Sequence, residues 1–253
     1  HLSETQKNIT TALIDYNTMQ PWQLPDVNGN LSQVAFDALG QVIVSTVYGW
    51  VDNVRVGNAD ISSYVTRPDA TFDDVLARPQ YYLQEMSDFF YYDAFMWMRE
   101  ARPIANINLV RQTWVSDLPL NESGLIQETV TFFDGFGREV EKKMRVEAGE
   151  AVLHTVNGDL VTDEARRAQV DTVAVRYAVS GRTVYNNKGK PVEQYQPYFS
   201  DTPQYEDQSD QHLLLLLPPP TVTFYDPLLR VVRINTPKGF FSCTVYSPWE
   251  NVM

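Results

Sequence analysis

Cysteine, histidine and long apolar runs are scarce in this sequence. The 253 residues include one cysteine, Cys243, and three histidines. A single cysteine excludes a disulfide framework within the chain and a cysteine-based zinc site. The longest strictly apolar run is Leu213–Leu217, far below the roughly 20 residues that cross a bilayer. We therefore predict no metal site, no cofactor and no membrane insertion by this segment.

Positive charge is also in short supply. The chain has 20 Lys and Arg residues against 32 Asp and Glu, a formal net charge of -12. Because nucleic-acid binding needs clustered cations that neutralise phosphates, we predict no nucleic-acid partner. Hydrophobic residues make up 43% of the chain, enough for a sizeable core and too many for a disordered segment.

Alternating segments rich in β-branched and aromatic residues predict a mainly β fold. The predicted strands are 33–36, 41–48, 129–133, 173–179, 221–225 and 242–246. Leu213–Leu217, which is followed by three prolines, is interpreted as a further buried strand.

One region departs from this pattern. A capping residue and an acidic first turn at Asp69–Ala77 predict one or two short helices within 71–87, with Pro79 as the stop or kink. The following segment, Asp88–Met98, is predicted to be a strongly aromatic strand. A helix is the alternative there, because Phe89, Tyr92 and Met96 would share one helical face.

Four segments share an eight-residue pattern, called here the repeat frame. It consists of an aromatic residue, Asp or Asn, two variable residues, usually Gly, a long polar residue, any residue, and Val or Ile. The frames begin at Phe36, Phe133, Tyr185 and Tyr225. Gly29 and Gly239 lie seven residues before Phe36 and Tyr246, where Tyr246–Met253 fits as a degraded fifth frame.

Each position of the frame has a physical role in a β-hairpin. The aromatic residue ends the incoming strand, and the Asp or Asn side chain binds backbone amides across the turn. Gly supplies the positive φ where the chain reverses. The predicted turn residues are Phe36, Asp37 and Gly40; Phe133, Asp134, Gly137 and Arg138; Tyr185, Asn186 and Gly189; and Tyr225, Asp226 and Arg230.

These hairpins resemble the YD repeats of the Rhs family. The segments 20–30, 36–40, 133–140, 180–192, 198–201 and 225–227 narrow the resemblance to the TcB-like (TcdB/SpvB-type) component of bacterial insecticidal toxin complexes. The chain departs from the pattern at Gln41 in place of Arg, Leu229 in place of the turn Gly, and Ser247 in place of Asp. These changes weaken the turn predictions but touch no catalytic role, since the motif carries none.

The resemblance implies a structural function. TcB-like proteins pair with a TcC-like partner, and their YD repeats form a hollow β-sheet shell. The shell encloses the toxic C-terminal domain of the partner until a TcA-like pore delivers it, which implies a secreted virulence complex. The chain would be one segment, 1–253, of such a shell, with insertions at 49–128 and 147–172 between hairpins. The gating β-propeller would lie upstream and the aspartyl autoprotease downstream.

The two ends agree with a piece of a longer polypeptide. The chain opens His1-Leu-Ser-Glu-Thr5, without Met and without the basic and apolar start of a signal peptide. The last frame stops where its outgoing strand should begin, which would leave an unpaired sheet edge.

Two other functions remain open. The repeats could form a surface or adhesion scaffold in which coplanar Tyr and Trp rings bind glycans or proteins. An acid–base enzyme is the third hypothesis, with candidate carboxylates at Asp73 and Asp74, at Asp159, Asp163 and Glu164, and at Glu206, Asp207 and Asp210. Most of these lie in contexts typical of turns or helix caps, and 202–211 is interpreted as a solvated acidic loop. A lone histidine in a predicted strand, as at His154, is more typical of packing or surface than of catalysis. We therefore predict that this segment is not an enzyme.

Overall fold

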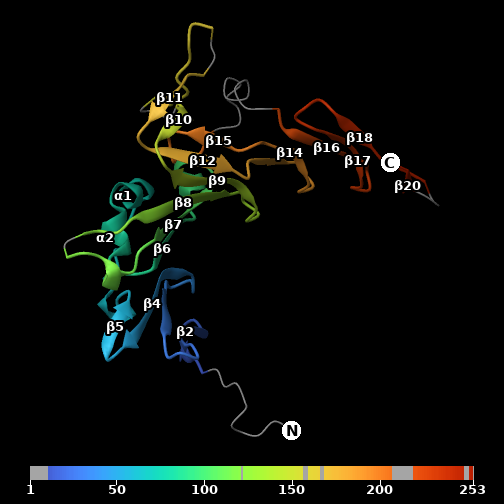
Figure 1. The fold of residues 1–253 in the computed structure, drawn as a ribbon. Coiled ribbons are helices and arrows are strands. Elements are labelled where there is room, and N and C mark those ends of the chain that lie inside the picture. The colour runs from blue at the N-terminus through green and yellow to red at the C-terminus, as the bar shows by residue number, and fades with distance from the viewer. Residues whose placement is uncertain are drawn as a thin grey trace. The chain divides into compact units, whose positions relative to one another are not determined.

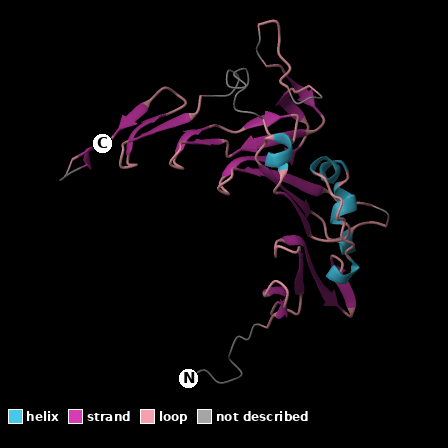
Figure 2. Cartoon of the chain, turned by 180° about the vertical axis from the view of Figure 1, so that it is seen from behind, coloured by secondary structure: helices cyan, strands magenta, loops and turns pink. Residues whose placement is uncertain are grey.

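The structure is a computed structural model that describes residues 11–120, 122–155, 159–165, 168–206, 219–247 and 251–252. The chain forms two compact units, of which the first comprises 1–93 with 106–128 and the second 94–105 with 129–253. Antiparallel strands dominate each unit (Figures 1 and 2). The mainly β prediction is thus confirmed. None of the helices in the described part of the chain is long and apolar enough to cross a bilayer.

The first unit is a twisted sheet with short helices beside it. Its strand order is β1-β2-β3-β4-β6-β7, and β5 pairs with β4. The strands are β1 (Leu13–Asp15), β2 (Gln20–Pro25), β3 (Leu31–Phe36), β4 (Val42–Val51), β5 (Val54–Gly57), β6 (Asp88–Asp93) and β7 (Ile104–Arg111), which begins in the second unit. The helices are η2 (Ile61–Ser63), α1 (Phe72–Ala77), α2 (Pro79–Leu83) and η3 (Val115–Asp117).

The helices predicted within 71–87 are confirmed as α1 and α2. The Thr71 side chain accepts a hydrogen bond from the Asp74 backbone N–H and caps α1. Pro79 occupies the start of α2, where its missing N–H costs no hydrogen bond. The Tyr82 ring of α2 lies 5.7 Å from the Phe89 ring of β6, and both side chains are buried. Helix packing on β6 therefore forms part of the core of this unit.

The second unit contains two larger sheets and a short β-ladder. Its first sheet has the order β8-β9-β12-β15-β10-β11, and the second has the order β13-β14-β16-β17-β18. The elements are α3 (Met96–Glu100), β8 (Ile126–Phe133, which begins in the first unit), β9 (Glu139–Val146), β10 (Gly149–Val152), β11 (Val170–Val173), β12 (Arg176–Ser180), β13 (Thr183–Tyr185), β14 (Pro191–Gln194), β15 (Tyr198–Ser200), β16 (Thr221–Tyr225), β17 (Val231–Asn235), β18 (Phe241–Cys243) and the paired strands β19 (Val245–Tyr246) and β20 (Asn251–Val252).

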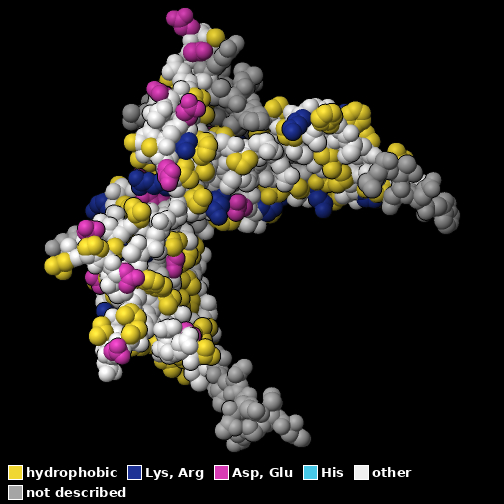
Figure 3. Space-filling view, in the orientation of Figure 1, with side chains coloured by type: hydrophobic (Ala, Val, Ile, Leu, Met, Phe, Trp, Pro, Cys, Tyr) yellow, Lys and Arg dark blue, Asp and Glu magenta, His cyan; other side chains and the backbone are white. Residues whose placement is uncertain are grey.

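The two sheets differ in how much they bury. Val152, Val179 and Tyr198 belong to a core cluster of the first sheet. In contrast, no residue of β14, β16, β17 or β18 is fully buried. Hydrophobic side chains gather on the visible face over these strands (Figure 3). Phe224 of β16 and Phe241 of β18 are exposed.

Three strand predictions need correction. The 88–98 strand ends at Asp93, and α3 then covers Met96–Glu100. The 173–179 strand is split into β11 and β12, because β11 pairs with β10 whereas β12 pairs with β9 and β15. The 242–246 strand is interrupted at Thr244 between β18 and β19. The strand predicted at Leu213–Leu217 lies outside the described residues.

Candidate functional site

The four repeat frames form hairpins with one backbone geometry. Every frame has a register shift at its aromatic residue, which pairs with the residue six positions on: Phe36 with Val42, Phe133 with Glu139, Tyr185 with Pro191, and Tyr225 with Val231. The same two backbone hydrogen bonds close the turns at 37–41, 134–138, 186–190 and 226–230, and also those at 26–30 and 236–240. This is the geometry of a four-residue turn that ends in a β-bulge.

The Asp or Asn side chain holds each turn closed. In the frame of Phe133, Asp134 Oδ1 accepts hydrogen bonds from the backbone N–H groups of Phe136 and Arg138 at 2.9 and 3.0 Å. Asp37, Asn186 and Asp226 accept equivalent pairs of bonds.

The residue between the two bonded N–H groups needs a left-handed backbone. Gly40, Gly137 and Gly189 have φ of 77°, 75° and 75°. Leu229 has φ of 63°, so the turn forms there without glycine. Three of the four turns therefore use the residue that adopts this conformation at least cost.

In two of the turns an arginine also contacts the aromatic ring that begins the next frame. Arg138 Nε donates to Asp134 Oδ2 at 2.7 Å, and its guanidinium lies 4.2 Å from the ring centroid of Tyr185. Arg230 repeats both contacts, at 2.7 Å to Asp226 Oδ2 and 4.3 Å to the Tyr246 ring. The Arg side chain thus pairs with its own turn and stacks on the following frame.

Tyrosine hydroxyls also connect successive frames, each tyrosine binding the frame before its own. Tyr185 Oη donates to the carbonyl of Glu139 at 3.2 Å, and Tyr225 Oη donates to the carbonyl of Pro191 at 2.9 Å. Glu139 and Pro191 both occupy the seventh position of the preceding frame. The repeat therefore encodes a contact between hairpins as well as a turn.

A further residue follows the same rule and was missed in the sequence. Tyr92 Oη donates to the carbonyl of Val42, the seventh residue of the frame of Phe36, at 2.9 Å. Tyr92-Asp93 is the start of a frame, but α3 follows in place of an Asp-x-x-Gly turn. A search for the aromatic-Asp pair without the glycine would have found it.

A buried ionic cluster in the second unit is formed by side chains of β9 and β15 and of residues that follow β12 and β15. It comprises Glu141, Lys143, Arg182, Tyr198 and Glu206, with His154 and Asp201 at its edge. The Lys143 side chain is 0% exposed, and its Nζ lies 2.6 Å from Glu206 Oε1 and 3.7 Å from Glu141 Oε1. Arg182 Nη1 lies 3.3 Å from Glu141 Oε2 and donates to Tyr198 Oη at 2.9 Å.

Strand alternation explains why these charges point the same way. Glu141 and Lys143 are two residues apart on β9, so they share one face of the sheet. Lys143 pairs in register with the buried Val179 of β12. Tyr198 Oη donates to Glu206 Oε2 at 2.6 Å, which anchors the segment after β15 to the same face.

Burial and neighbouring charges shift the pKa values of the two glutamates in opposite directions. Burial raises the pKa of Glu141 to about 7, against the attraction of Lys143. Burial also raises the pKa of Glu206, but Lys143 and the hydroxyls of Ser200 and Tyr198 outweigh it and hold that pKa at about 2. Burial raises the pKa of Tyr198, with the charges of Glu206 and Glu141 acting in the same direction, so its hydroxyl stays a donor.

The carboxylates considered for acid–base catalysis lie in different surroundings. Asp74 forms an exposed ion pair with Arg78 at 2.9 Å. Asp159, Asp163 and Glu164 are exposed, and Asp207 and Asp210 lie outside the described residues. The solvated-loop interpretation is wrong for Glu206, which is buried because Lys143 pairs with it. In the described part of the chain, no group of three or more His, Cys, Asp and Glu side chains is arranged to hold a metal ion.

A second polar node is buried in the first unit. Tyr48 Oη donates to Asp60 Oδ2 and accepts from Gln33 Nε2 at 3.0 Å. Burial and the hydrogen bond to Asp60 raise the pKa of Tyr48 to about 12, while bonds from Ser62 and Tyr48 lower that of Asp60 to about 2. The node ties β3, β4 and η2 together.

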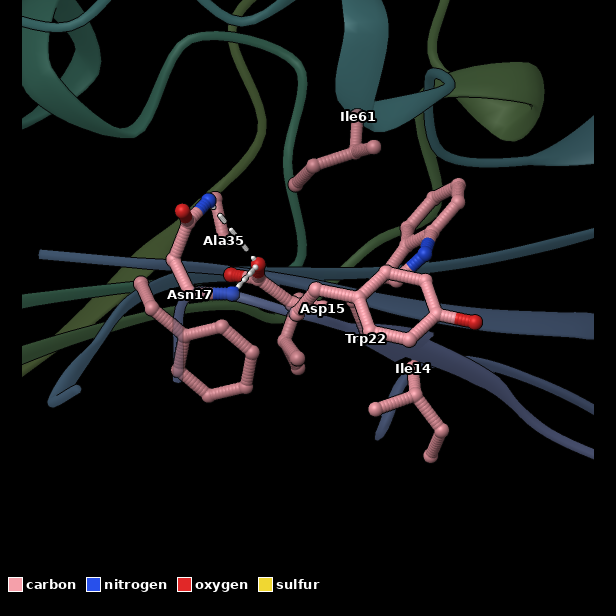
Figure 4. A pocket seen from close by; sticks show the side chains of 9 residues that line it. Ile14, Asp15, Asn17, Trp22, Ala35 and Ile61 are labelled. Carbon is pink, nitrogen blue, oxygen red and sulfur yellow. Dashed lines mark hydrogen bonds between the residues drawn. The ribbon is translucent and has the colours of Figure 1, made fainter. Parts of the chain in front are cut away.

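One cavity and one pair of aromatic rings bear on the binding-scaffold hypothesis. An open cavity of about 570 Å³ is lined by Trp22, Ile61 and Asp15, among others (Figure 4). Asp15 Oδ1 accepts bonds from Asn17 at 2.8 and 3.2 Å, so the carboxylate in this lining is engaged in a local turn. The neighbouring rings of Tyr48 and Trp50 are inclined at 72°, which is an edge contact and not the coplanar pair of a glycan platform.

The fold resembles solved toxin-complex chains. The crystal structure of TcdB2-TccC3 matches 96% of this chain with a TM-score of 0.79 and 27% identity. A Photorhabdus luminescens Tc holotoxin pore matches 96% with a TM-score of 0.75 and 23% identity, and TcdB2-TccC3-Cdc42 matches 96% with 0.75 and 22%. This chain spans 11–13% of the length of those chains. Neither a protein-family model nor a curated protein matches it.

Proposed function

We propose that this chain is a wall segment of the β-sheet shell in a TcB-like toxin component. The shell encloses the toxic C-terminal domain of a TcC-like partner before a TcA-like pore delivers it, and it acts outside the producing cell. The segment itself carries out no catalysis. The observation that carries the proposal is the likeness to TcdB2-TccC3 along 96% of the chain, at a TM-score of 0.79.

The repeated contacts support a wall. Each tyrosine of the second unit's frames at 185 and 225 binds the carbonyl of the frame before it. A hairpin array built this way extends by adding one frame to the last, and its strands satisfy each other's backbone groups. Continuous pairing of this kind excludes proteases and other chains from an enclosed space.

Protease protection of the enclosed domain tests the proposal. The experiment uses the full protein with its TcC-like partner. Ala178 of β12 pairs with Met144 of β9 and Phe199 of β15, so Ala178→Pro places a proline in a central strand and opens the pairing. We expect rapid cleavage of the enclosed domain in A178P and slow cleavage in the wild type.

The matched control places proline where the frame accepts it. Gly135 follows Asp134 in its turn, and Pro227 occupies the same position after Asp226. A Cβ added at Gly135 meets nothing within 4 Å. Gly135→Pro should therefore leave protection unchanged. Equal cleavage of the partner domain alone and inside the wild-type complex would refute the shell function, whether or not A178P assembles.

A further inference from the structure

Three successive hairpin turns of the second unit form one edge of the array, called here the frame edge and defined as residues 134–138, 186–190 and 226–230. The β8–β9, β13–β14 and β16–β17 hairpins end in these turns (Figure 1). The Tyr185 hydroxyl binds the carbonyl of Glu139, directly after the first turn, and the Tyr225 hydroxyl binds the carbonyl of Pro191, directly after the second. These bonds hold each turn beside the next, so the side chains at the tips form a row.

Large side chains occupy the tips of this row and face solvent. The fourth frame position is Phe136 in the first turn, Lys188 in the second and Leu228 in the third. Phe136 is 87% exposed, Leu228 is 72% exposed, and Lys188 is exposed as well. Because the same turn forms around Lys188, its geometry does not require an apolar residue at this position. Exposed apolar side chains gathered among polar groups are typical of interaction surfaces.

The frame edge is cationic, although the chain is acidic. Its turns hold four cations and two carboxylates, whereas the whole chain has a formal net charge of -12. Arg138 and Arg230 are paired with the aspartates of their own turns at 2.5 and 2.7 Å. The second turn has Asn186 instead, and Lys188 and Lys190 form no ion pair with any described carboxylate. Asn186 still accepts the two backbone bonds that close the turn, so only the counter-charge is lost.

The spacing of the turns defines what could cover them. Strand β14 pairs with β16, so the second and third turns lie two strands apart. That separation is about 10 Å, which about three residues of an extended chain span. An extended segment with a carboxylate and an apolar side chain about three residues apart therefore contacts Lys188 and Leu228 together. Opposite charge steers such a segment to the edge and fixes its register.

An anionic membrane surface fits the frame edge less well. Polybasic surfaces that bind acidic lipids carry about four to eight cations. The aspartates of the first and third turns compensate two of the four cations here, and the two that remain belong to one turn. Two neighbouring lysines are enough to bind one carboxylate of a protein segment.

We propose that the frame edge is a docking surface for an extended acidic segment of the TcC-like partner. A carboxylate of that segment binds Lys188 and Lys190, and its apolar side chains pack against Phe136 and Leu228. This inference rests on the proposed shell function, because it assigns the segment to that partner. The turn with Asn186 in place of Asp thereby becomes a recognition point in a wall of otherwise similar hairpins.

Zero-length cross-linking of the full protein in complex with its TcC-like partner tests the contact. A carbodiimide joins a lysine amine to a carboxylate that touches it, and mass spectrometry identifies the joined peptides. We expect amide links from Lys188 or Lys190 to Asp or Glu residues of the partner. Links from these lysines to carboxylates of their own chain alone, or no links, would overturn the proposal.

Two charge reversals separate the frame edge from a general effect of charge. Lys188→Glu changes a tip of the edge. Lys238→Glu changes the exposed tip of the 236–240 turn, which has the same closing bonds but lies at the opposite end of β17. We expect K188E to slow association with the partner by about tenfold in about 50 mM salt and less in about 500 mM, and K238E to change it by less than about twofold. Equal effects of the two variants would contradict the assignment.

The shell function and the docking surface can fail separately. Protease protection in the wild-type complex decides the first, and the cross-links decide the second even where protection holds. Vesicles that contain phosphatidylserine test the lipid alternative with the full protein. Vesicle binding that is lost in K188E and kept in K238E would assign the frame edge to a lipid surface and overturn the proposal.

Discussion

The turn at Asp134 and the buried ionic cluster use similar ion pairs in opposite surroundings. Arg138 approaches Asp134 to 2.5 Å with side chains 29% and 21% exposed, whereas Lys143 approaches Glu206 to 2.6 Å with side chains 0% and 4% exposed. The first pair spans four residues and the second spans 63. The distances are alike, so the difference in solvent and in sequence separation decides what each pair does.

Solvent sets the cost of breaking the two pairs. An exposed pair is screened by water and adds at most about 1 kcal/mol. In a buried pair, the attraction between the two charges offsets the free-energy cost of taking them out of water. When one partner is removed, the other charge still bears that cost. The cluster therefore resists single substitutions poorly and the turns resist them well.

Lys143→Met should have the largest effect on this comparison. The variant leaves Glu206 and Glu141 buried beside one fewer cation, and we expect a loss of about 3–5 kcal/mol in the free energy of unfolding. Denaturant unfolding measures it. Lys142→Met on the other face of β9 is the matched control and should change stability by about 0.5 kcal/mol or less. Equal losses in the two variants would contradict the account.

Glu141→Gln should remove a pH dependence that the turns do not share. Burial raises the pKa of Glu141 from 4.5 to about 7, so its folded form holds the proton more strongly. Its stabilising contribution is complete below about pH 4.5 and is lost as pH rises to about 7. Relative to E141Q, the wild type should lose on the order of 1–3 kcal/mol across that window. Unfolding curves at pH 4.5, 6 and 7.5 measure the difference.

The pH dependence of stability expected from Asp134 has the opposite sign. Burial alone would raise the pKa of Asp134, but the hydrogen bonds of Arg138 lower it below its ordinary value. Its contribution is therefore present above about pH 4 and fades only in acid. An Asp134→Asn protein with the same slope as the wild type between pH 4.5 and 7.5 would agree with this. A lost slope in D134N would place the titration in the turn instead.

The same contrast explains which parts of the structure can be predicted from the sequence. The Asp-x-x-Gly turns close within five residues, so their pattern predicts hairpins from composition and spacing alone. The cluster joins β9 to residues around 154, 182 and 206, and no local pattern relates them. Glu206 sits in an acidic polar run that indicates a solvated loop. The one available signal was Glu141-Lys142-Lys143, which must bury a charge if β9 lies inside a sheet.

Tyr92 and the 88–98 segment show a second limit. The repeat frame also requires a long polar residue and a Val or Ile after the turn, whereas Trp97 and Arg99 occupy these positions after Tyr92-Asp93, where α3 forms. Aromatic composition favours a strand over the whole segment, but a strand pairs only as far as its neighbour extends. Only the first two positions of the frame, Tyr92 and Asp93, can be recognised in the sequence.

Asp134→Ala should have a moderate effect. It removes the acceptor for the backbone N–H groups of Phe136 and Arg138 and for Arg138 Nε. Because the turn is largely solvated, water replaces part of these bonds, and we expect a loss of about 1–2 kcal/mol. Asp134→Asn keeps the acceptor oxygen, as Asn186 does in its own turn, and should lose about half as much or less. Thermal unfolding of the two variants gives the comparison, and equal losses would assign the effect to the Arg138 ion pair.

Leu229→Gly should have the smallest effect, and it should stabilise. Leu229 holds φ of 63° where the equivalent turns have glycine. A left-handed conformation costs a residue with a Cβ roughly 1–2 kcal/mol, but glycine also makes the unfolded chain more disordered by roughly 0.5–1 kcal/mol. The two terms oppose, so we expect a net gain of about 0.5 kcal/mol.

The reciprocal change isolates the conformational term. Gly137 has φ of 75°, and a Cβ added there meets nothing within 4 Å. Gly137→Ala therefore introduces no clash, and the loss it causes, expected near 0.5–1 kcal/mol, is the backbone cost less the entropy that alanine removes from the unfolded chain. Equal and opposite shifts in G137A and L229G would mean that the left-handed position alone sets the turn energy. A neutral L229G beside a destabilised G137A would instead mean that the half-buried Leu229 side chain offsets its backbone strain by packing.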